Sequence, residues 1–472
     1  MKAALYFLLG VIPLSALPMS AQQAEHSHSS GYIRMATAIG DDYFDGRDTR
    51  TRVQRHLRIA NELGVHYLRC AFSWNGIEPE QGRYDFRFWD MLVEESLKAG
   101  IELIPYVAYT PEWAAREKKN FWQQPPADPQ TFAAFMEKLA TRYRGRVHSW
   151  ELWNEPDNRD YWQGSADEFA AMVIPAAQAI HRADPSAKLV LGGMSYGAGE
   201  FFQQLAAKHR IQQYLDVVAM HAYPETWHEQ RAEEVFQGEL PEMLDVANSA
   251  ANHPSFWLNE MGYADYRYDR SHASVYGTNT YYTYEHTERY AADFLLKSFL
   301  MTAASGDVSL AGWYRIDDFA ETDPRMSADK VNDHLGLERS NHARKPGFYA
   351  FRLFNHLLSK PFRVVDSTTS ATAPQDSQAV IHTFLRDDSR VVVAGWLRSS
   401  TYDEVPVHTG EVVDHRRESV NIALPCPAAT VTNYDALGNH STTEGKRTRE
   451  LKNVVLKGDR VYLAFIRCET TN

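Results

Sequence analysis

Strand-like and helix-like segments alternate along most of this chain, and no other feature restricts its fold as strongly. Eight short apolar runs have strand character, at Tyr32–Ile39, His66–Phe72, Glu102–Val107, His148–Trp153, Lys188–Gly192, Val217–His221, Phe256–Asn259 and Leu310–Arg315. Amphipathic segments with helical character separate them, among them Thr49–Leu63, Phe86–Ala99, Pro129–Tyr143 and Asp167–Ala183. This alternation predicts parallel strands, because each parallel crossover needs about a dozen residues or more.

Eight such units predict a closed (β/α)8 barrel, the TIM barrel, over residues 31–360. An open doubly wound sheet is the alternative, but no glycine-rich phosphate loop follows the first strand. In residues 361–472 the helical period disappears, and short strands such as RVVVAGWL and RVYLAFI alternate with turn-prone segments. That pattern is typical of a small antiparallel β-sandwich domain.

The N-terminus has the features of a secretory signal peptide. Lys2 precedes a mostly apolar run from Ala3 to Ile12, and small and polar residues follow around Ala21. We expect a signal peptide at residues 1–21, a flexible leader at 22–30, and a periplasmic or secreted protein. The run is shorter than the ~17 apolar residues that a bilayer span needs, so we expect no membrane span in the mature chain.

The amino-acid composition indicates which classes of binding partner are to be expected. Lys and Arg total 49 against 61 Asp and Glu, a formal charge of −12, which argues against nucleic-acid binding. The three cysteines are too few for a disulfide scaffold, although export would permit Cys426 and Cys468 to pair. Aromatic residues make up 12% of the chain, and such rings either fill cores or line sites for sugars.

Two glutamates stand where the fourth and seventh strands are expected to end. Glu155 follows the fourth strand in SWELWNEP, and Glu260 ends the seventh in FWLNEMGY. Functional side chains of a parallel barrel gather at the carboxyl ends of its strands, and these two strands lie on opposite sides. We therefore expect the two carboxylates to face each other across the mouth.

Facing carboxylates suit the cleavage of a glycosidic bond. One protonates the leaving oxygen, and the other meets the positive charge that develops at the anomeric carbon. The alternative is that both glutamates form salt bridges in a packed rim. Their partly apolar neighbours, Trp153, Trp257 and Met261, make that alternative less favourable, because desolvated carboxylates cost stability.

Five segments extend this pattern over most of residues 69–263, namely SWNGIEPEQGRYDF, AYTPEWAA, WELWNEP, VVAMHAYP and WLNEMGY. Together they resemble clan A of the (β/α)8 retaining glycoside hydrolases, and most closely glycoside hydrolase family 39. The resemblance implies that Glu155 is the acid/base, that Glu260 is the nucleophile, and that Asn154 holds the sugar 2-hydroxyl. Family 39 members often carry a sandwich domain packed on the barrel, so the resemblance also implies that residues 361–472 brace the barrel.

Four further side chains at strand ends are candidates for the site. Arg69 ends the second strand, where its charge would keep Glu260 ionised, unless it forms another ion pair in the rim. His221 and Tyr223 close the sixth strand, where Tyr223 could donate a hydrogen bond to Glu260 and His221 could instead be a buried core residue. Trp313, at the end of the eighth strand, is expected to form the floor of the sugar subsite, with core packing as its alternative.

Aromatic residues in the loops suggest further sugar contacts. Trp113, Trp122 and Trp162 follow the third and fourth strands and are candidates for stacking on sugar rings. A tyrosine-rich segment from Tyr263 to Tyr290 is expected to form a wall or lid over the groove, because long loops of this composition are usually functional.

These observations predict an exported retaining β-glycosidase that acts on β-linked poly- or oligosaccharides and needs no metal or organic cofactor. One rival is a carbohydrate-binding protein that kept the barrel but lost turnover. The other is a transglycosidase that passes sugars to sugar acceptors at the same site.

Overall fold

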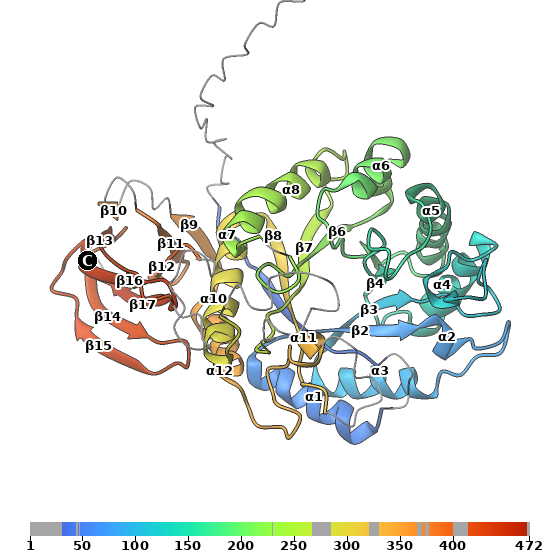
Figure 1. Cartoon of the computed structure of the whole chain (residues 1–472), viewed down its shortest axis with the longest axis horizontal. Coiled ribbons are helices and arrows are strands. Elements are labelled where there is room, and N and C mark those ends of the chain that lie inside the picture. The colour runs from blue at the N-terminus through green and yellow to red at the C-terminus, as the bar shows by residue number, and fades with distance from the viewer. Residues whose placement is uncertain are drawn as a thin grey trace, which may run out of the picture.

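In the computed structural model, eight parallel strands close into a barrel in the order of the sequence (Figure 1). The structure describes residues 31–43, 46, 48–228, 230–266, 285–320, 330–365, 371–372, 377–399 and 414–469. The barrel strands are β1 (Ala36–Gly40), β2 (Tyr67–Ser73), β3 (Glu102–Ala108), β4 (Ser149–Leu152), β5 (Lys188–Leu191), β6 (Val217–Ala222), β7 (Ser255–Met261) and β8 (Val308–Tyr314). The predicted TIM barrel is confirmed, and the open sheet is excluded because β1 pairs with β8.

Local capping signals begin and end the helices around the barrel. The side chain of Thr49 accepts a hydrogen bond from the backbone N–H of Arg52 at the start of α1, and Gly64 ends that helix with φ 78°. Ser165 and Glu168 form a reciprocal capping box at the start of α5. The helices are α1 (Arg50–Leu63), α2 (Trp74–Ile77), α3 (Arg87–Ala99), α4 (Pro129–Tyr143), α5 (Ala166–Ala183), α6 (Glu200–His209), α7 (Ala232–Glu234), α8 (Leu240–Asn248), α10 (Glu288–Ser305), α11 (Lys330–Asp333) and α12 (Pro346–Leu357).

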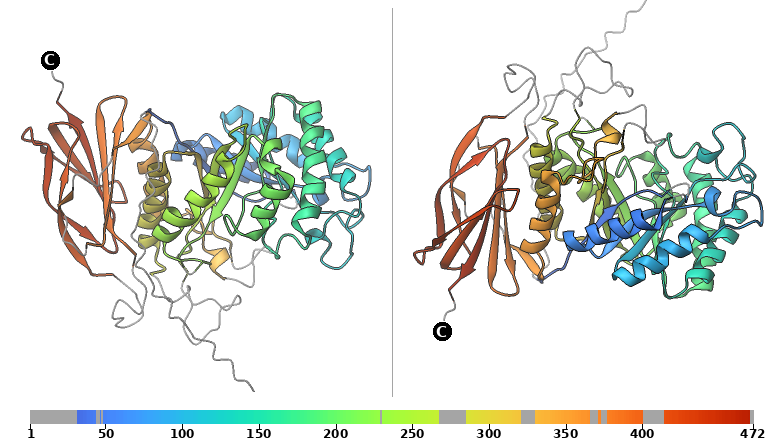
Figure 2. Two further views of the ribbon diagram at one scale, coloured as in Figure 1. Left: turned by 90° about the horizontal axis from the view of Figure 1, so that it is seen from above. Right: turned by 90° about the horizontal axis from the view of Figure 1, so that it is seen from below.

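The C-terminal part is an antiparallel sandwich of two sheets, as predicted (Figure 2). Its strands are β9 (Phe362–Val365), β10 (Ala371–Thr372), β11 (Ala379–Arg386), β12 (Arg390–Leu397), β13 (Arg417–Ala423), β14 (Ala428–Tyr434), β15 (His440–Glu444), β16 (Glu450–Lys457) and β17 (Tyr462–Cys468). The larger sheet has the order β15-β14-β17-β12-β11-β9, and the smaller has the order β10-β13-β16. A disulfide joins Cys426 to Cys468 across a sequence separation of 42 residues.

The sandwich packs directly on the barrel through α10 and α12, which lie between the two parts (Figure 1). Buried hydrogen bonds hold the sandwich against the barrel. Trp396 Nε1 donates to Glu233 Oε1 at 2.8 Å, and the backbone N–H of Val461 donates to Asp293 Oδ1 at 2.8 Å. Apolar side chains such as Phe384 and Leu463 belong to the same hydrophobic core as the barrel helices. The sandwich therefore braces the barrel, because separation would leave buried acids without their donors.

The predicted signal peptide and leader, residues 1–30, lie outside the described residues, so they remain predictions. Within the described parts of the chain, no helix combines the length and the apolar character that crossing a membrane requires.

We expect the double variant Cys426→Ser with Cys468→Ser to be less stable than the wild type by about 2–4 kcal/mol, because the disulfide constrains the unfolded chain. Denaturant unfolding under non-reducing conditions measures this difference. Cys70→Ser is the matched control for thiol chemistry, since Cys70 is a free cysteine buried in the barrel. Equal unfolding midpoints for the double variant and the wild type would show that the disulfide does not stabilise the sandwich.

Candidate active site

A buried ion pair lies inside the barrel beneath its mouth. Arg69 of β2 donates from Nε and Nη2 to the two carboxylate oxygens of Glu151 in β4, at 2.8 and 2.9 Å. Glu151 also accepts hydrogen bonds from Asn259 Nδ2 at 3.0 Å and from the backbone N–H of Gly193 at 3.1 Å. Because these donors saturate the Glu151 carboxylate, the Arg69 guanidinium is held in one orientation at the centre of the barrel.

An extra residue in β7 sets the direction of the next side chain. Met220 pairs with Leu258, but His221 pairs with Glu260, so Asn259 forms a bulge. The bulge fits because residue 312 is glycine, where a Cβ would lie 2.1 Å from the backbone oxygen of Asn259. As a result, Asn259 and Glu260 both reach toward the barrel axis.

Glu260 is held by donors on two sides. Arg69 Nη1 forms a close ion pair with Glu260 Oε2, and the Tyr223 hydroxyl donates to Glu260 Oε1 at 2.5 Å. Burial alone would raise the pKa of Glu260, but the charges of His221 and Arg69 and the hydrogen bond from Tyr223 hold that pKa below its usual value. Glu260 therefore stays ionised near neutral pH, as a nucleophilic carboxylate must.

Glu155 lies in a sharp turn directly after β4. Trp153 and Glu155 have φ angles of 82° and 45°, in the left-handed region that non-glycine residues rarely adopt. Trp153 Nε1 donates to the backbone oxygen of Tyr161 at 3.2 Å, which closes the turn. The Glu155 carboxyl shares a hydrogen bond of 2.7 Å with His221 Nδ1 and accepts one of 3.3 Å from Asn158 Nδ2. Strained backbone of this kind is typical of functional sites.

The two carboxyl groups converge. One oxygen of Glu155, one oxygen of Glu260 and a ring nitrogen of His221 all lie within 4.8 Å of one another. Retaining glycosidases hold their carboxyl groups about 5–5.5 Å apart, whereas inverting enzymes leave about 6.5–9.5 Å for a water molecule. The separation therefore suits direct attack by one carboxylate, followed by water.

His221 links the two carboxyl groups. Burial alone would lower its pKa, but the negative charges of Glu260 and Glu155 hold the pKa of His221 above its usual value, against the opposing charge of Arg69. The ring fills the space beside Gly193, where a Cβ would lie 2.1 Å from Nε2. His221 is thus both a buried residue and a residue of the site, as the two interpretations of its sequence position proposed.

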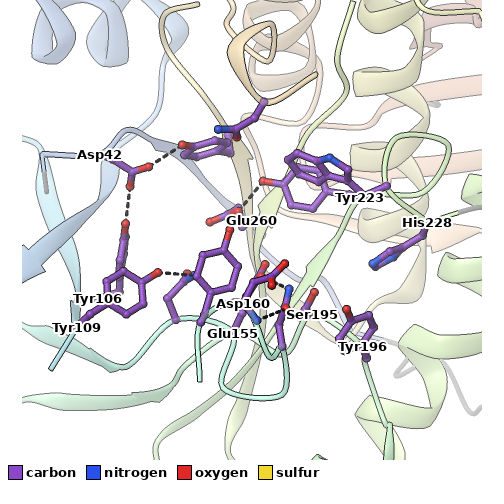
Figure 3. Close-up of a pocket in the computed structure, with 16 residues that line it drawn as sticks. Asp42, Tyr106, Tyr109, Glu155, Asp160, Ser195, Tyr196, Tyr223, His228 and Glu260 are labelled. Carbon is purple, nitrogen blue, oxygen red and sulfur yellow. Dashed lines mark hydrogen bonds between the residues drawn. The ribbon is translucent and has the colours of Figure 1, made fainter. Parts of the chain in front are cut away.

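A cavity of about 500 Å³ opens above the carboxylates (Figure 3). Asp42, just after β1, forms one end of it. Tyr106 and Tyr314 donate their hydroxyl protons to the two oxygens of Asp42, at 2.5 and 2.6 Å. Burial raises the pKa of Asp42, and the hydrogen bonds from the two tyrosines lower it only in part. This end of the cavity is polar and closed.

Two loops build the opposite end of the cavity, on the far side of the carboxylates (Figure 3). The Asp157 carboxylate accepts hydrogen bonds from the backbone N–H groups of Ser195 and Tyr196 at 2.9 and 2.8 Å, and so fixes the loop after β5. The Tyr196 ring stacks on the ring of His228, from the loop after β6, with a centroid separation of 6.0 Å. Burial raises the pKa of Asp157 to about 6, and the two backbone hydrogen bonds oppose that rise.

Of the site residues predicted from sequence, the structure brings together Glu155, Glu260, Arg69, His221 and Tyr223, with Asn154 beside them. Asn154 Oδ1 accepts a hydrogen bond from Arg69 Nη2 at 2.8 Å, and its Nδ2 donates to the Tyr109 hydroxyl at 3.3 Å.

The prediction for Trp313 is wrong, because its side chain points outward from β8. Trp313 is buried in the hydrophobic core and packs edge-on against Phe299 of α10. Successive residues of a strand face opposite sides, so the neighbouring residue Tyr314 reaches the cavity instead.

Three other aromatic predictions are also wrong. Trp162 is fully buried, where it packs against Trp153. Trp113 packs edge-on against Trp74 with its indole N–H donated to a backbone oxygen, and it does not reach the cavity. Tyr263 is buried and donates its hydroxyl proton to the backbone oxygen of Glu285. All three side chains are engaged in contacts within the protein, and none of them lines the cavity.

Two loop predictions have other outcomes. Trp122 is partly exposed and lies edge-on to Tyr109 and Tyr161, which do line the cavity. Residues 267–284, the main part of the expected tyrosine-rich wall, lie outside the described residues, so that wall remains a prediction.

Sequence reasoning missed Glu151, Asp42, Asp157 and Tyr196. Glu151 stands in the middle of a predicted buried strand, and a lone acid there signals an internal ion pair. Asp42 follows the first strand, as Glu155 follows the fourth, so the rule of strand ends could have found it. Asp157 and Tyr196 had no local signal, because their partners lie in another loop.

The cluster of Glu155, His221 and Glu260 has donor atoms that a divalent cation could use. However, the Arg69 guanidinium already occupies one side of Glu260 as its counterion. A second cation there would meet strong repulsion, so the arrangement fits a carboxylate pair better than a metal centre.

Comparisons with known proteins agree with this geometry. The model of the family described as Glycosyl hydrolases family 39 matches residues 28–398. A family 39 glycoside hydrolase from Bacteroides cellulosilyticus WH2 shares the fold with a TM-score of 0.68 at 14% identity, over 92% of this chain and 81% of that one. A monomeric β-xylosidase from Caulobacter crescentus CB15 has a TM-score of 0.60 at 16% identity, over 93% and 98%.

Shorter segments are similar to curated proteins. An aryl-phospho-β-D-glucosidase of Bacillus subtilis is 30% identical over 115 residues, which are 23% of this chain and 24% of that protein. A β-galactosidase of Halorubrum lacusprofundi is 24% identical over 187 residues, 34% of this chain and 27% of that protein. The chain thus spans about a quarter of the length of these relatives.

We expect Tyr223→Phe to raise the pKa of Glu260. The substitution removes a hydrogen bond that stabilises the ionised carboxylate, while Arg69 and His221 stay in place. The carboxyl ¹³C resonance of Glu260, followed against pH in protein with labelled glutamate, measures the shift. Tyr290→Phe, which removes a hydroxyl bonded to Glu225 instead, is the matched control. An unchanged or lower pKa would contradict this account of how Glu260 is kept ionised.

Proposed function

The chain belongs to glycosyl hydrolase family 39, and from that premise we propose that it is an exported retaining β-glycosidase with Glu155 as acid/base and Glu260 as nucleophile. The observation that carries the proposal is the convergence of the two carboxyl groups within 4.8 Å, one of them paired with Arg69. The two groups have unlike surroundings, which separates their roles.

In the first step, a Glu260 carboxylate oxygen attacks the anomeric carbon. The bond from that carbon to the leaving oxygen breaks, and the proton of Glu155 passes to this oxygen. Arg69 and Tyr223 hold Glu260 by one oxygen each, so its orientation is set before the substrate enters.

In the second step, water attacks the same carbon of the glycosyl-enzyme. Glu155 takes the proton of that water, and the bond to Glu260 breaks, which restores both residues. His221 shares a hydrogen bond with Glu155, and its Nδ1 lies 3.8 Å from Glu260 Oε1. A change of charge on either carboxyl group during the cycle therefore changes the pKa of His221.

The cavity wall favours a neutral sugar. Its described residues include four carboxylates, Asp42, Glu155, Asp160 and Glu260, and neither lysine nor arginine is among them. A uronic acid would therefore bring its negative charge toward the ionised Glu260, and the described lining residues offer it neither lysine nor arginine. The names of the β-xylosidase, the β-galactosidase and the aryl-phospho-β-D-glucosidase among the relatives all support the β configuration.

Two features support export. The N-terminal sequence has the parts of a signal peptide. The Cys426–Cys468 disulfide is typical of proteins in oxidising compartments. The retention of both carboxyl groups, with Glu260 kept ionised by Arg69 and Tyr223, argues against a binding protein without turnover, because binding alone does not need an ionised nucleophile.

We expect Glu155→Ala to slow the cleavage of poor leaving groups by about 10²–10⁴-fold, since that is the usual value of general acid–base help. Glu260→Ala should nearly abolish turnover of every substrate. With azide present and an activated aryl β-glycoside, the first variant should yield the β-glycosyl azide and the second the α-glycosyl azide. Product anomers are read by NMR.

Glu80→Gln is the control for the loss of a carboxylate, because Glu80 is an exposed residue that pairs with Arg83. Its rates should equal those of the wild type. If folded variants of Glu155 and Glu260 also kept wild-type rates, the assignment would be wrong.

We expect kcat/KM for aryl β-glycosides of neutral sugars to exceed that for the aryl β-glucuronide by roughly 100-fold or more, because like charges in a desolvated site cost several kcal/mol. A panel of nitrophenyl β-glycosides at constant ionic strength measures the ratio. Efficient cleavage of the glucuronide would show that the wall of carboxylates does not select the substrate.

A further inference from the structure

The cavity has two unlike ends, and the two carboxyl groups lie between them. Asp42, Tyr106 and Tyr109 stand on one side of Glu155 and Glu260, whereas Ser195, Tyr196 and His228 stand on the other (Figure 3). A glycosidic substrate also has two parts, the sugar that is transferred to the nucleophile and the group that leaves. Each part therefore occupies one end.

Asn154 shows which end receives the transferred sugar. Its amide is bonded to Arg69 of β2 and to Tyr109 just after β3, so it faces the end that Asp42 closes. With the role that the resemblance implies for Asn154, the sugar attacked by Glu260 lies toward Asp42, where the Tyr106 and Tyr314 hydroxyls complete a polar, buried end of the cavity. The leaving group therefore occupies the opposite end of the cavity.

The opposite end is built differently. Tyr196 is 55% exposed, although it is held by the backbone hydrogen bond to Asp157 and by its stack on His228. This exposed ring leaves apolar area in water at the cavity wall, and a ligand ring that lay on it would remove that area from water. Burial lowers the pKa of His228, against the opposing charge of Glu155, so this ring stays neutral near neutral pH.

The loop after β6 connects this platform to the reacting centre. The backbone N–H of His228 donates to the carbonyl of Tyr223, whose hydroxyl holds Glu260. Asp157, which fixes Tyr196, follows Glu155 by two positions in the turn after β4. Both walls of this end are therefore anchored to neighbours of the two carboxyl groups: Tyr223, which holds Glu260, and Asp157, two positions after Glu155.

On the basis of the proposed function, we infer that Tyr196, stacked on His228, is the platform on which a second sugar ring lies as leaving group or as acceptor. The exposed ring presents a flat apolar surface, which suits the axial C–H face of a pyranose, and the polar residues Ser195 and Asp160 line the same cavity. The enzyme then acts on glycosides whose leaving group is itself a sugar, and the same surface receives a sugar acceptor when transfer competes with water.

The test compares two substrates of the same transferred sugar, a β-linked disaccharide and the β-glycosyl fluoride. Fluoride has no ring to stack, so its departure does not use the platform. We expect Tyr196→Ala to lower kcat/KM for the disaccharide by about tenfold more than for the fluoride, as the loss of one ring contact implies. Tyr196→Phe, which keeps the ring, should recover most of that difference.

Transfer gives a second readout. With the glycosyl fluoride as donor and a monosaccharide as acceptor, Tyr196→Ala should lower the ratio of transfer to hydrolysis by a similar factor. Tyr214→Ala is the control, because Tyr214 is also partly exposed but does not line the cavity, and it should match the wild type in both assays.

Three results would overturn the inference or its premise. Equal losses for the disaccharide and the fluoride would place Tyr196 in support of the reacting centre rather than of a second sugar. No loss with either substrate would show that the platform is unused. A wild type that cleaves neither substrate, nor any aryl β-glycoside, would instead reject the proposed function.

Discussion

The ion pair between Arg69 and Glu151 organises the centre of this molecule. A guanidinium buried inside a barrel must be paired with a counterion, and Glu151 is the counterion of Arg69 that takes no part in the reaction. The remaining nitrogen of Arg69 then reaches Glu260, and its Nη2 also holds Asn154. One buried cation thus fixes side chains of β4 and β7 and of the turn after β4, and keeps one carboxylate ionised, so stability and chemistry depend on the same contacts.

The two carboxyl groups differ because their donors differ. Glu260 accepts from a permanent cation and a phenol, whereas Glu155 has a histidine and an amide beside a strained turn. Charge on either group acts on His221, which lies against both. A change of charge on Glu155 or Glu260 during the reaction therefore acts on the whole cluster through His221.

The sandwich domain and the helices beside it support the cluster of Glu155, Glu260 and His221 indirectly. The sandwich packs on α10 and α12, behind the strands that carry Glu260 and Tyr314, and buried acids accept hydrogen bonds across the contact. Three of the four tryptophans expected to contact sugars pack against other aromatic side chains instead: Trp313 against Phe299 of α10, Trp113 against Trp74, and Trp162 against Trp153. The aromatic rings that line the cavity are mostly tyrosines, whose hydroxyl at the ring edge can form hydrogen bonds there, together with Trp227.

The sequence by itself determined the barrel, the sandwich and the two glutamates, because strand alternation, helix caps and residues at strand ends are local patterns. It also placed Arg69, Asn154, His221 and Tyr223 near those glutamates. Only the tertiary structure decided which ring of a neighbouring pair faces the cavity, as Trp313 and Tyr314 show. The bulge at Asn259, the Arg69–Glu151 pair and the loop that presents Tyr196 depend on contacts between segments far apart in the chain, and no local pattern encodes a contact of that kind.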